Sequence, residues 1–269
     1  MLQASSGPDV LEALDRHERE VSAAFARALR AYVDDRPDRL VYVTGLPASF
    51  ANGVKAPRLA EADVDETIQR VSGLLRSAGV PGTWVLTDLS RPEDLGERLE
   101  RAGIPQSFEL PILTADMDRL GLDREDPAAL EIRRVANVDD HRRWLFAMEV
   151  GFDMPNGHTR TIDQTALAVG FDADAKWVRF VGTTTNTVVA SSGLMLFGGV
   201  AGVYNVATVP EARRRGFGAA MTRAALRYAR DRGYRVAILG TSPMGRGVYE
   251  RMGFRDVAVE RHHVYEPSA

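Results

Sequence analysis

Residues 203–218 read VYNVATVPEARRRGFG, and this stretch decides the fold that we expect for the chain. An apolar strand is followed by Arg213–Arg215 and two glycines, and the residues from Ala219 to Arg232 have the pattern of a helix. Glycine costs ~1 kcal/mol relative to alanine in a helix, and cations at a helix start oppose its dipole. Both features become favourable where an anion binds, because free N–H groups and arginines stabilise its charge. The stretch therefore predicts a phosphate-binding loop.

Two common phosphate loops do not fit these residues. A Walker loop requires a lysine and a hydroxyl residue after its second glycine, and neither follows Gly218. A dinucleotide-binding fingerprint requires a third glycine and an acidic residue at the end of the next strand, which ends in Gly240 instead. The pattern that fits is Arg/Gln-x-x-Gly-x-Gly/Ala, with Arg213, Gly216 and Gly218 in the defining positions.

A second informative stretch, residues 242–254, reads SPMGRGVYERMGF. Ser242 suits the N-cap of a helix, Pro243 its first position, and Gly253 the position just past its end. A last strand is predicted from Arg255 to Tyr265. The predicted order is thus strand, Arg/Gly loop, long helix, strand, short helix and strand.

In this order of elements the chain resembles the GNAT superfamily of N-acetyltransferases, from Leu130 to Tyr265 and most specifically from Tyr204 to Phe254. The resemblance implies that the loop holds the pyrophosphate of acetyl-coenzyme A, and that the strand before it binds the pantetheine arm. Many family members carry an asparagine at the position of Ser242, so this serine either contacts the cofactor or only caps the helix. The implied cofactor-binding set is Val206, Ala207, Thr208, Arg213, Arg214, Arg215, Gly216, Phe217, Gly218, Ala219 and Ser242.

The resemblance also implies that Tyr249 is the acid that protonates the departing thiolate. A phenol of pKa ~10 is protonated at neutral pH, and a thiolate of pKa ~8.5 can accept its proton at modest cost. The ordinary alternative is a tyrosine at the rim of the core with its hydroxyl in water. Asn205, in the preceding strand, either reaches the acyl group or faces outward beside a strand bulge.

The general base is less well defined, because residues 204–209 contain no carboxylate. An amine acceptor must lose a proton before it attacks, since an unperturbed lysine has a pKa of ~10.4. Three candidates lie in the region expected near the acceptor, namely Glu149, Asp153 and His158, and each has a surface or capping role as its ordinary alternative.

The same plan recurs in the first half of the chain. Residues 76–79 and 230–233 each end a helical pattern before an apolar strand, and aligning Gly103 with Gly253 places Leu99 where Tyr249 stands. The first half has no Arg/Gly loop, and chance similarity of two helix–strand–helix units is the alternative. We expect an α/β protein with a tandem GNAT fold, in which each half has a mixed, mostly antiparallel sheet with flanking helices. The expected domains are 1–122, which is degenerate, and 128–269, which is the acetyltransferase.

Composition restricts the function further. The 269-residue chain is 45% hydrophobic and 26% charged, which is typical of a globular protein, and its net charge of −3 does not favour nucleic-acid binding. It has no cysteine, so a thiol nucleophile and a thiolate metal site are excluded. His262 and His263 are adjacent on a predicted strand and point to opposite faces, so no metal site is expected. No apolar stretch approaches the ~20 residues of a membrane span, and without a signal-peptide pattern a cytoplasmic location is expected.

The predicted function is acetyl transfer from acetyl-coenzyme A to a primary amine of a small molecule or peptide, by direct attack. A backbone N–H near Val206 would stabilise the oxyanion. One alternative is a non-catalytic protein that senses acyl-coenzyme A, and another is transfer of a longer acyl or aminoacyl group. A homodimer is left open.

Overall fold

The computed structural model describes residues 7–172 and 174–267, which form two compact units. The C-terminal unit consists of Ile112–Val257 and the start of the first helix up to Val10. The N-terminal unit consists of Leu11–Pro111 and the segment from Ala258 onward. Both units are discontinuous in sequence, because strands β5 (Gln106–Asp116) and β11 (Arg255–Tyr265) each contribute residues to both. The domain limits 1–122 and 128–269 stay a prediction.

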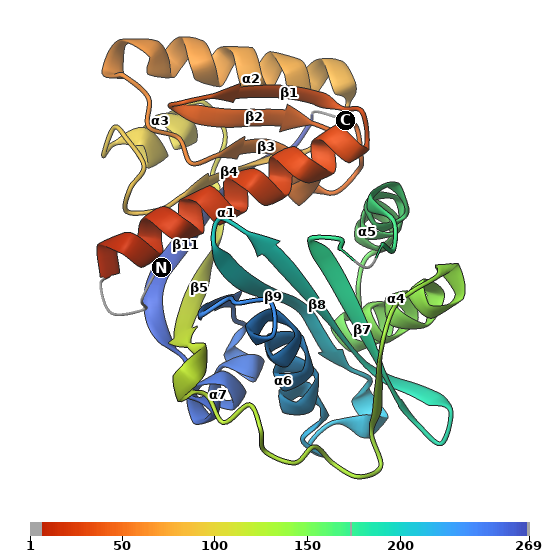
Figure 1. The fold of residues 1–269 in the computed structure, drawn as a ribbon. Helices are drawn as coiled ribbons and strands as arrows, with labels where there is room; N and C mark the ends of the chain where they lie inside the picture. Colours follow the sequence, from red (N-terminus) through yellow and green to blue (C-terminus); the bar gives the residue numbers. More distant parts are fainter. Residues whose placement is uncertain (1–6, 173, 268–269) are drawn as a thin grey trace. The chain divides into compact units, whose positions relative to one another are not determined.

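The C-terminal unit is a sheet in the order β5-β10-β9-β8-β7-β6, in which only the pair β9–β10 is parallel. Figure 1 shows α4 and α6 beside this sheet. The elements are β6 (Glu131–Arg134), α4 (Val138–Phe152), α5 (Asn156–Val169), β7 (Trp177–Thr184), β8 (Thr187–Phe197), β9 (Val200–Thr208), α6 (Phe217–Arg230), β10 (Val236–Gly240) and α7 (Pro243–Met252), with 3₁₀ turns at Met117–Arg119 and Pro210–Ala212.

Side chains alternate between the two faces of this sheet, as the period of a strand requires. Phe180 packs edge-on against Tyr228 of α6, whereas Trp177 packs edge-on against Trp144 of α4. The main core forms on the α6 face, where Phe217 is fully buried. Helix α6 is thus fixed on one face of the sheet, and α4 is fixed on the other.

The N-terminal unit has the strand order β1-β2-β3-β4-β11, and only the pair β3–β4 is parallel. The helix expected from Asp9 to Val33 ends at Ala28, because a strand begins at Tyr32. The elements are α1 (Gly7–Ala28), β1 (Tyr32–Arg36), β2 (Arg39–Val43), β3 (Asn52–Lys55), α2 (Val64–Ala78), β4 (Gly82–Leu86) and α3 (Leu95–Arg101), with 3₁₀ turns at Ser49–Ala51 and Glu61–Asp63.

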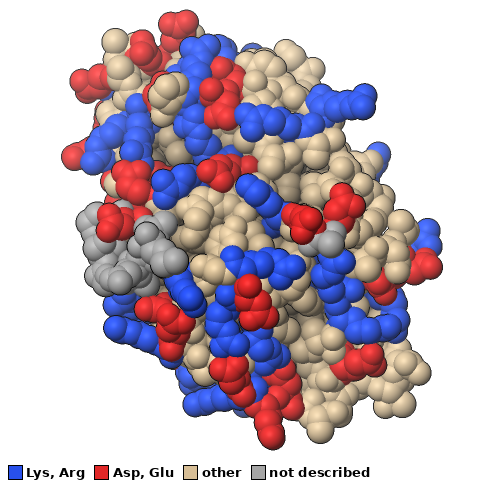
Figure 2. All heavy atoms as spheres, in the orientation of Figure 1, with Lys and Arg blue, Asp and Glu red and all other residues tan. Residues whose placement is uncertain are grey.

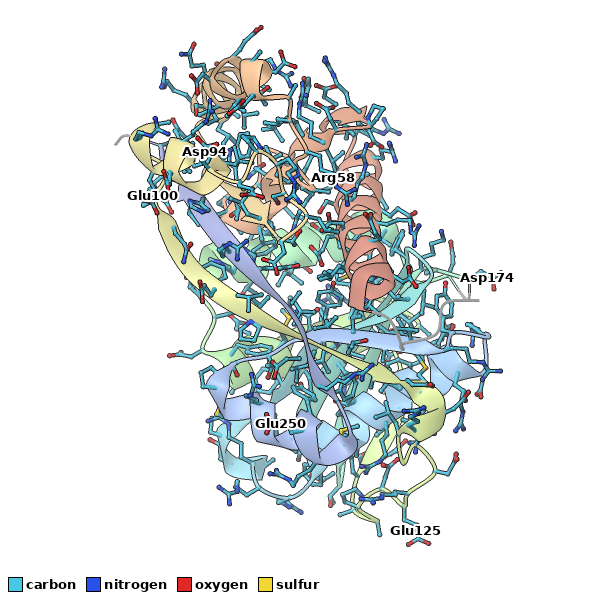
Figure 3. The ribbon with its side chains drawn as sticks, turned by 90° about the vertical axis from the view of Figure 1, so that its left-hand side faces the viewer. Arg58, Asp94, Glu100, Glu125, Asp174 and Glu250 are labelled. Atoms are coloured by element: carbon cyan, nitrogen blue, oxygen red, sulfur yellow. The ribbon has the colours of Figure 1, made fainter. Side chains whose placement is uncertain are left out.

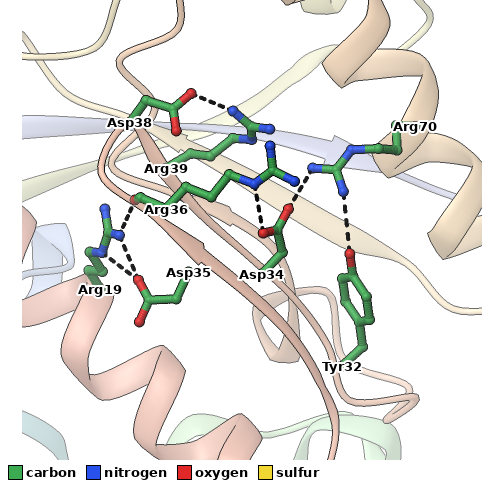
Figure 4. Close-up of polar contacts among 8 residues, drawn as sticks. All are labelled: Arg19, Tyr32, Asp34, Asp35, Arg36, Asp38, Arg39 and Arg70. Carbon is green, nitrogen blue, oxygen red and sulfur yellow. Dashed lines mark hydrogen bonds and ion pairs between the residues drawn. The ribbon is translucent and has the colours of Figure 1, made fainter.

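The β1–β2 hairpin is held to both neighbouring helices by ion pairs (Figure 4). Arg19 of α1 pairs with Asp35 at 2.6 Å, and Arg70 of α2 pairs with Asp34 at 2.9 Å. These contacts lie at the surface, where single ion pairs contribute about 0–1 kcal/mol each. They fix the hairpin's position more than they stabilise the unit.

The two units repeat one plan down to the backbone hydrogen bonds at their helix ends. Gly103 and Gly253 both have positive φ, and the residue after each donates to the carbonyl of the residue five before it, Leu99 or Tyr249, at 2.9 and 3.0 Å. Gly79 and Gly233 end α2 and the α6 segment in the same way. The alternative of a chance similarity does not account for two such matches in the same order.

Candidate active site

Strands β9 and β10 form a fork in the C-terminal unit. They pair only at Ala201–Ala237 and Gly202–Ile238. Beyond these pairs β10 stays bonded to β5, up to Gly240, while β9 stays bonded to β8, up to Thr208. A ligand in the fork can therefore reach backbone groups on an edge of β9 that no strand covers. Residues Val206–Thr208 lie on that edge.

Helix α6 begins beside the fork with a left-handed glycine. Gly216 is its N-cap, with φ of 79°, and no side chain caps the helix. The first N–H groups of a helix have no partner within it, so here they are available to an anion. Gly218 faces Val206 and Thr208, and a Cβ on it would come only to 3.9 Å from either. No acidic residue occurs in the first turn.

The three arginines of the loop have different roles. Arg213 is held by the protein itself, since its guanidinium donates to the carbonyl of Gly151 at 3.0 Å and to that of Thr208 at 3.3 Å. Arg215 lies over the ring of Phe217, 4.8 Å from its centre. Arg214 has positive φ, is exposed, and makes no hydrogen bond or ion pair with any residue that the structure describes. Of the predicted phosphate ligands, Arg214 is the cation left for an anion.

A bulge interrupts β9 where the acyl group is expected. Three steps along β9, from Tyr204 to Ala207, correspond to two along β8, from Gly193 to Ser191. Asn205 sits in the bulge with φ of 52°, a conformation that asparagine tolerates better than most residues. Its Oδ1 lies against Gly193 of β8. The bulge takes one backbone unit of β9 out of the pairing with β8.

Tyr249 lies between α7 and α6. Its ring contacts Gly245 one turn earlier and packs edge-on against Phe254. Burial raises the pKa of Tyr249 to about 12, and a hydrogen bond with Thr222 of α6 acts in the opposite direction. Ser242 accepts the N–H of Gly245 at 3.3 Å, so it does cap α7. Whether Ser242 also contacts the cofactor stays a prediction.

The raised pKa predicts how turnover depends on pH. A phenol with a pKa near 12 stays protonated throughout pH 7 to 10, so Tyr249 remains a competent acid over this range. We expect no fall in kcat toward pH 10 that can be assigned to Tyr249. The check is a pH profile of kcat for the wild type and Tyr249→Phe. A loss centred near pH 10 that occurs only in the wild type would contradict this environment for the phenol.

The C-terminal end of α4 packs directly on β9. Gly151 lies so close that a Cβ there would come within 2.7 Å of the Ala207 Cβ and 3.2 Å of the Thr208 nitrogen. Of the three predicted bases, Glu149 is half-buried in the last turns of this helix, and Asp153 is its left-handed C-cap. His158 belongs to the first turn of α5. The structure thus brings Glu149 and Asp153 near the end of β9, and gives Asp153 a helix-ending role as well.

Gly151 was not predicted from the sequence, and it gives a direct test of this packing. Alanine there is expected to lower the free energy of unfolding by about 1–3 kcal/mol, because α4 must move away from β9. Acetyl-coenzyme A should bind more weakly as well, since the Gly151 carbonyl holds Arg213. Urea denaturation and calorimetry measure the two effects.

Gly73 is the matched control. It lies in helix α2 with nothing within 4 Å of a built Cβ, so Gly73→Ala should stabilise the protein by up to about 1 kcal/mol. If Gly151→Ala were also neutral or stabilising, the contact between α4 and β9 would not be as tight as described.

The N-terminal unit lacks each of these features. Its helix α2, which corresponds to α6, begins with the acidic residues Asp65 and Glu66. Its parallel pair also stops after two residues, but a bridge then joins the segments that follow, with Leu59 N–H bonded to the Arg91 carbonyl at 3.0 Å. Leu99, in the place of Tyr249, is fully buried. The counterpart of the fork is therefore closed, and the helix start repels anions.

Other predicted features lie away from the fork. His262 stacks on Phe108, whereas His263 is buried and contacts the Ile104 carbonyl, so the two rings do point to opposite faces. In the described part of the chain, no three His, Asp or Glu residues are placed to hold a metal ion. No helix among the described residues is long and apolar enough to cross a bilayer. Figure 2 shows basic and acidic side chains intermixed over the face in view.

Three comparisons bear on the family. The model of the acetyltransferase (GNAT) domain matches residues 196–257, which include the fork, the loop and α7. The mycothiol acetyltransferase of Rhodococcus jostii (strain RHA1) is 24% identical over 268 residues, covering 90% of this chain and 86% of that protein.

Among solved structures, a GCN5-related N-acetyltransferase from Kribbella flavida has a TM-score of 0.69 at 18% identity, covering 94% of this chain and 96% of its own. A tandem GNAT protein from the clavulanic acid biosynthesis pathway has a TM-score of 0.61 at 14% identity, covering 100% of this chain and 98% of its own. At these identities the structural matches show the fold alone, and the fold is the predicted one. The chain belongs to the GNAT superfamily and is an acetyltransferase with a tandem GNAT fold.

Proposed function

We propose that the C-terminal unit transfers the acetyl group of acetyl-coenzyme A to a primary amine. The observation that carries the proposal is the fork of β9 and β10 beside the uncapped start of α6. Pyrophosphate would bind the free N–H groups of residues 217–219 and the guanidinium of Arg214. The pantetheine arm would extend along the open edge of β9 at Val206–Thr208, where a backbone can bond to an amide-containing chain.

The reaction would be a direct attack without a covalent enzyme intermediate. The neutral amine nitrogen attacks the thioester carbon, and a backbone N–H released by the bulge near Val206 donates to the oxyanion. The carbon–sulfur bond then breaks, the thiolate takes the proton of Tyr249, and the amine nitrogen gives up its own proton. The carboxylates of Glu149 and Asp153, at the end of α4, are the candidates that could receive it.

The acceptor follows less directly than the donor. The relative from Rhodococcus is a mycothiol acetyltransferase, and its match extends over 90% of this chain. The acceptor of that enzyme is therefore the first amine to test on this one. A panel of polyamines, amino sugars and peptide N-termini covers the other small-molecule and peptide amines.

The experiment is incubation with acetyl-coenzyme A and each amine, with the acetylated product detected by mass spectrometry. Formation of an acetamide that depends on the enzyme and is lost in Arg214→Glu/Gly216→Asp supports the proposal. Binding of acetyl-coenzyme A without transfer to any amine would instead favour a protein that senses the cofactor. Preference for a longer acyl donor would favour the other alternative.

A further inference from the structure

A cavity in the N-terminal unit is separate from all the residues assigned above. Its volume is about 440 Å³, which is in the range of small-molecule sites. It lies between α3, the segment that follows β4, and β11. Figure 3 labels Glu100 at the end of α3 beside this part of the unit. The residues that matter for its chemistry are Glu93, Glu97, Glu100, Arg91, Arg261 and His263.

The imidazole of His263 presents a lone pair to this cavity. The side chain is 2% exposed, and its Nδ1 lies 3.3 Å from the Ile104 carbonyl oxygen. A carbonyl only accepts, so Nδ1 carries the proton. Burial lowers the pKa of His263, which keeps the ring neutral at pH 7 and leaves Nε2 as an acceptor. Nε2 lies beside Gly96 of α3, at 3.4 Å from a Cβ built there.

Three glutamates line the same cavity at spacings that place them on one side of α3. Glu93, Glu97 and Glu100 are exposed, and no cation in the described part of the chain forms an ion pair with them. The two arginines of the cavity are already engaged. Arg261 pairs with Asp88 at 3.2 Å, and Arg91 donates to the carbonyls of Asp88 and Ser90.

We infer that this cavity binds a small organic molecule with two or more ammonium groups. One ammonium would donate to Nε2 of His263 and to Glu100, and a second would lie against Glu97 or Glu93. Charge-assisted hydrogen bonds of this kind are about twice as strong as neutral ones. The described His, Asp and Glu residues form no group suited to a metal ion, so an extended cation fits these acceptors better than a point charge. The inference does not depend on the proposed acetyl transfer.

The test is calorimetric titration of the full chain with spermidine. The wild type should bind it saturably, and Glu97→Gln/Glu100→Gln should weaken binding at least about tenfold. Asp63→Asn/Glu66→Gln removes the same two charges from α2 of the same unit, and should change affinity less than about twofold. A dicarboxylate of similar length, glutarate, should not bind.

A second variant blocks the cavity without changing its charge. Gly96→Leu places a side chain in front of His263 Nε2 and should also weaken binding at least about tenfold. Unchanged acetyl-coenzyme A binding by this variant would show that the protein remains folded. The inference is overturned if the wild type shows no saturable binding, or if neither cavity variant weakens it. It is also overturned if the α2 control weakens binding as much, even where spermidine proves to be acetylated.

Discussion

Arg214→Glu/Gly216→Asp is expected to weaken acetyl-coenzyme A binding by at least about a hundredfold, because it reverses the charge at the start of α6. The wild-type helix begins with an uncapped left-handed glycine, a free arginine and no acidic residue in its first turn. Every one of these features favours an anion at that end of the dipole. Two carboxylates there would repel the pyrophosphate, and an aspartate side chain at 216 would itself cap the N–H groups. Calorimetry measures the loss.

The opposite end of the same segment supplies the matched control. Arg232→Glu/Gly233→Asp changes the same residue types, the same net charge and another glycine of positive φ. It should lower stability, because carboxylates at a helix C-terminus oppose the dipole and Arg232 no longer covers the Tyr228 ring. It should leave the affinity for acetyl-coenzyme A within about twofold. Equal weakening by both variants would mean that destabilisation, not loss of a phosphate site, causes the effect.

Tyr249→Phe is expected to lower kcat by about a hundredfold while leaving acetyl-coenzyme A affinity nearly unchanged. Proton transfer by a positioned acid contributes about 10²–10⁴-fold to a rate, and the phenol is held between Thr222, Gly245 and Phe254. The ring that packs on the core remains in the variant, so the fold and the fork should persist. Steady-state kinetics with a saturating amine and a binding titration separate the two quantities.

Tyr228→Phe is the control for the loss of a tyrosine hydroxyl from the same unit. Tyr228 packs on Phe180 in α6 and has no assigned part in the reaction. Its variant should keep wild-type turnover. If Tyr249→Phe did so too, Tyr249 would be only a packing residue and another group would protonate the thiolate.

The sequence predicted the C-terminal elements closely because their signals are local. The last strand was predicted from Arg255 to Tyr265 and has these bounds, and the Ser-Pro start and Gly end of α7 lie where expected. Caps and left-handed glycines act within a few residues, so one sequence is enough to identify them. The repeat was visible for the same reason, since Gly103 and Gly253 end their helices alike.

What the sequence could not predict depends on distant partners. Strands β1 and β5 and helix α5 were not predicted, and the division of β5 and β11 between two units has no local signal. Gly151 matters because Ala207 lies against it, yet in sequence it is only a glycine near a helix end. Arg213 carried the expected motif, but its guanidinium braces Gly151 and Thr208, so its share in phosphate binding stays a prediction.

The number of acetyl-coenzyme A molecules bound per chain tests the central claim most directly. Calorimetric titration of the full chain should give one site, because only the C-terminal unit has an open fork beside an uncapped helix start. The N-terminal unit has a closed bridge and an acidic helix start in the same places. Two sites would show that the N-terminal unit has kept its cofactor site. No binding at all would contradict the assignment of the fork itself.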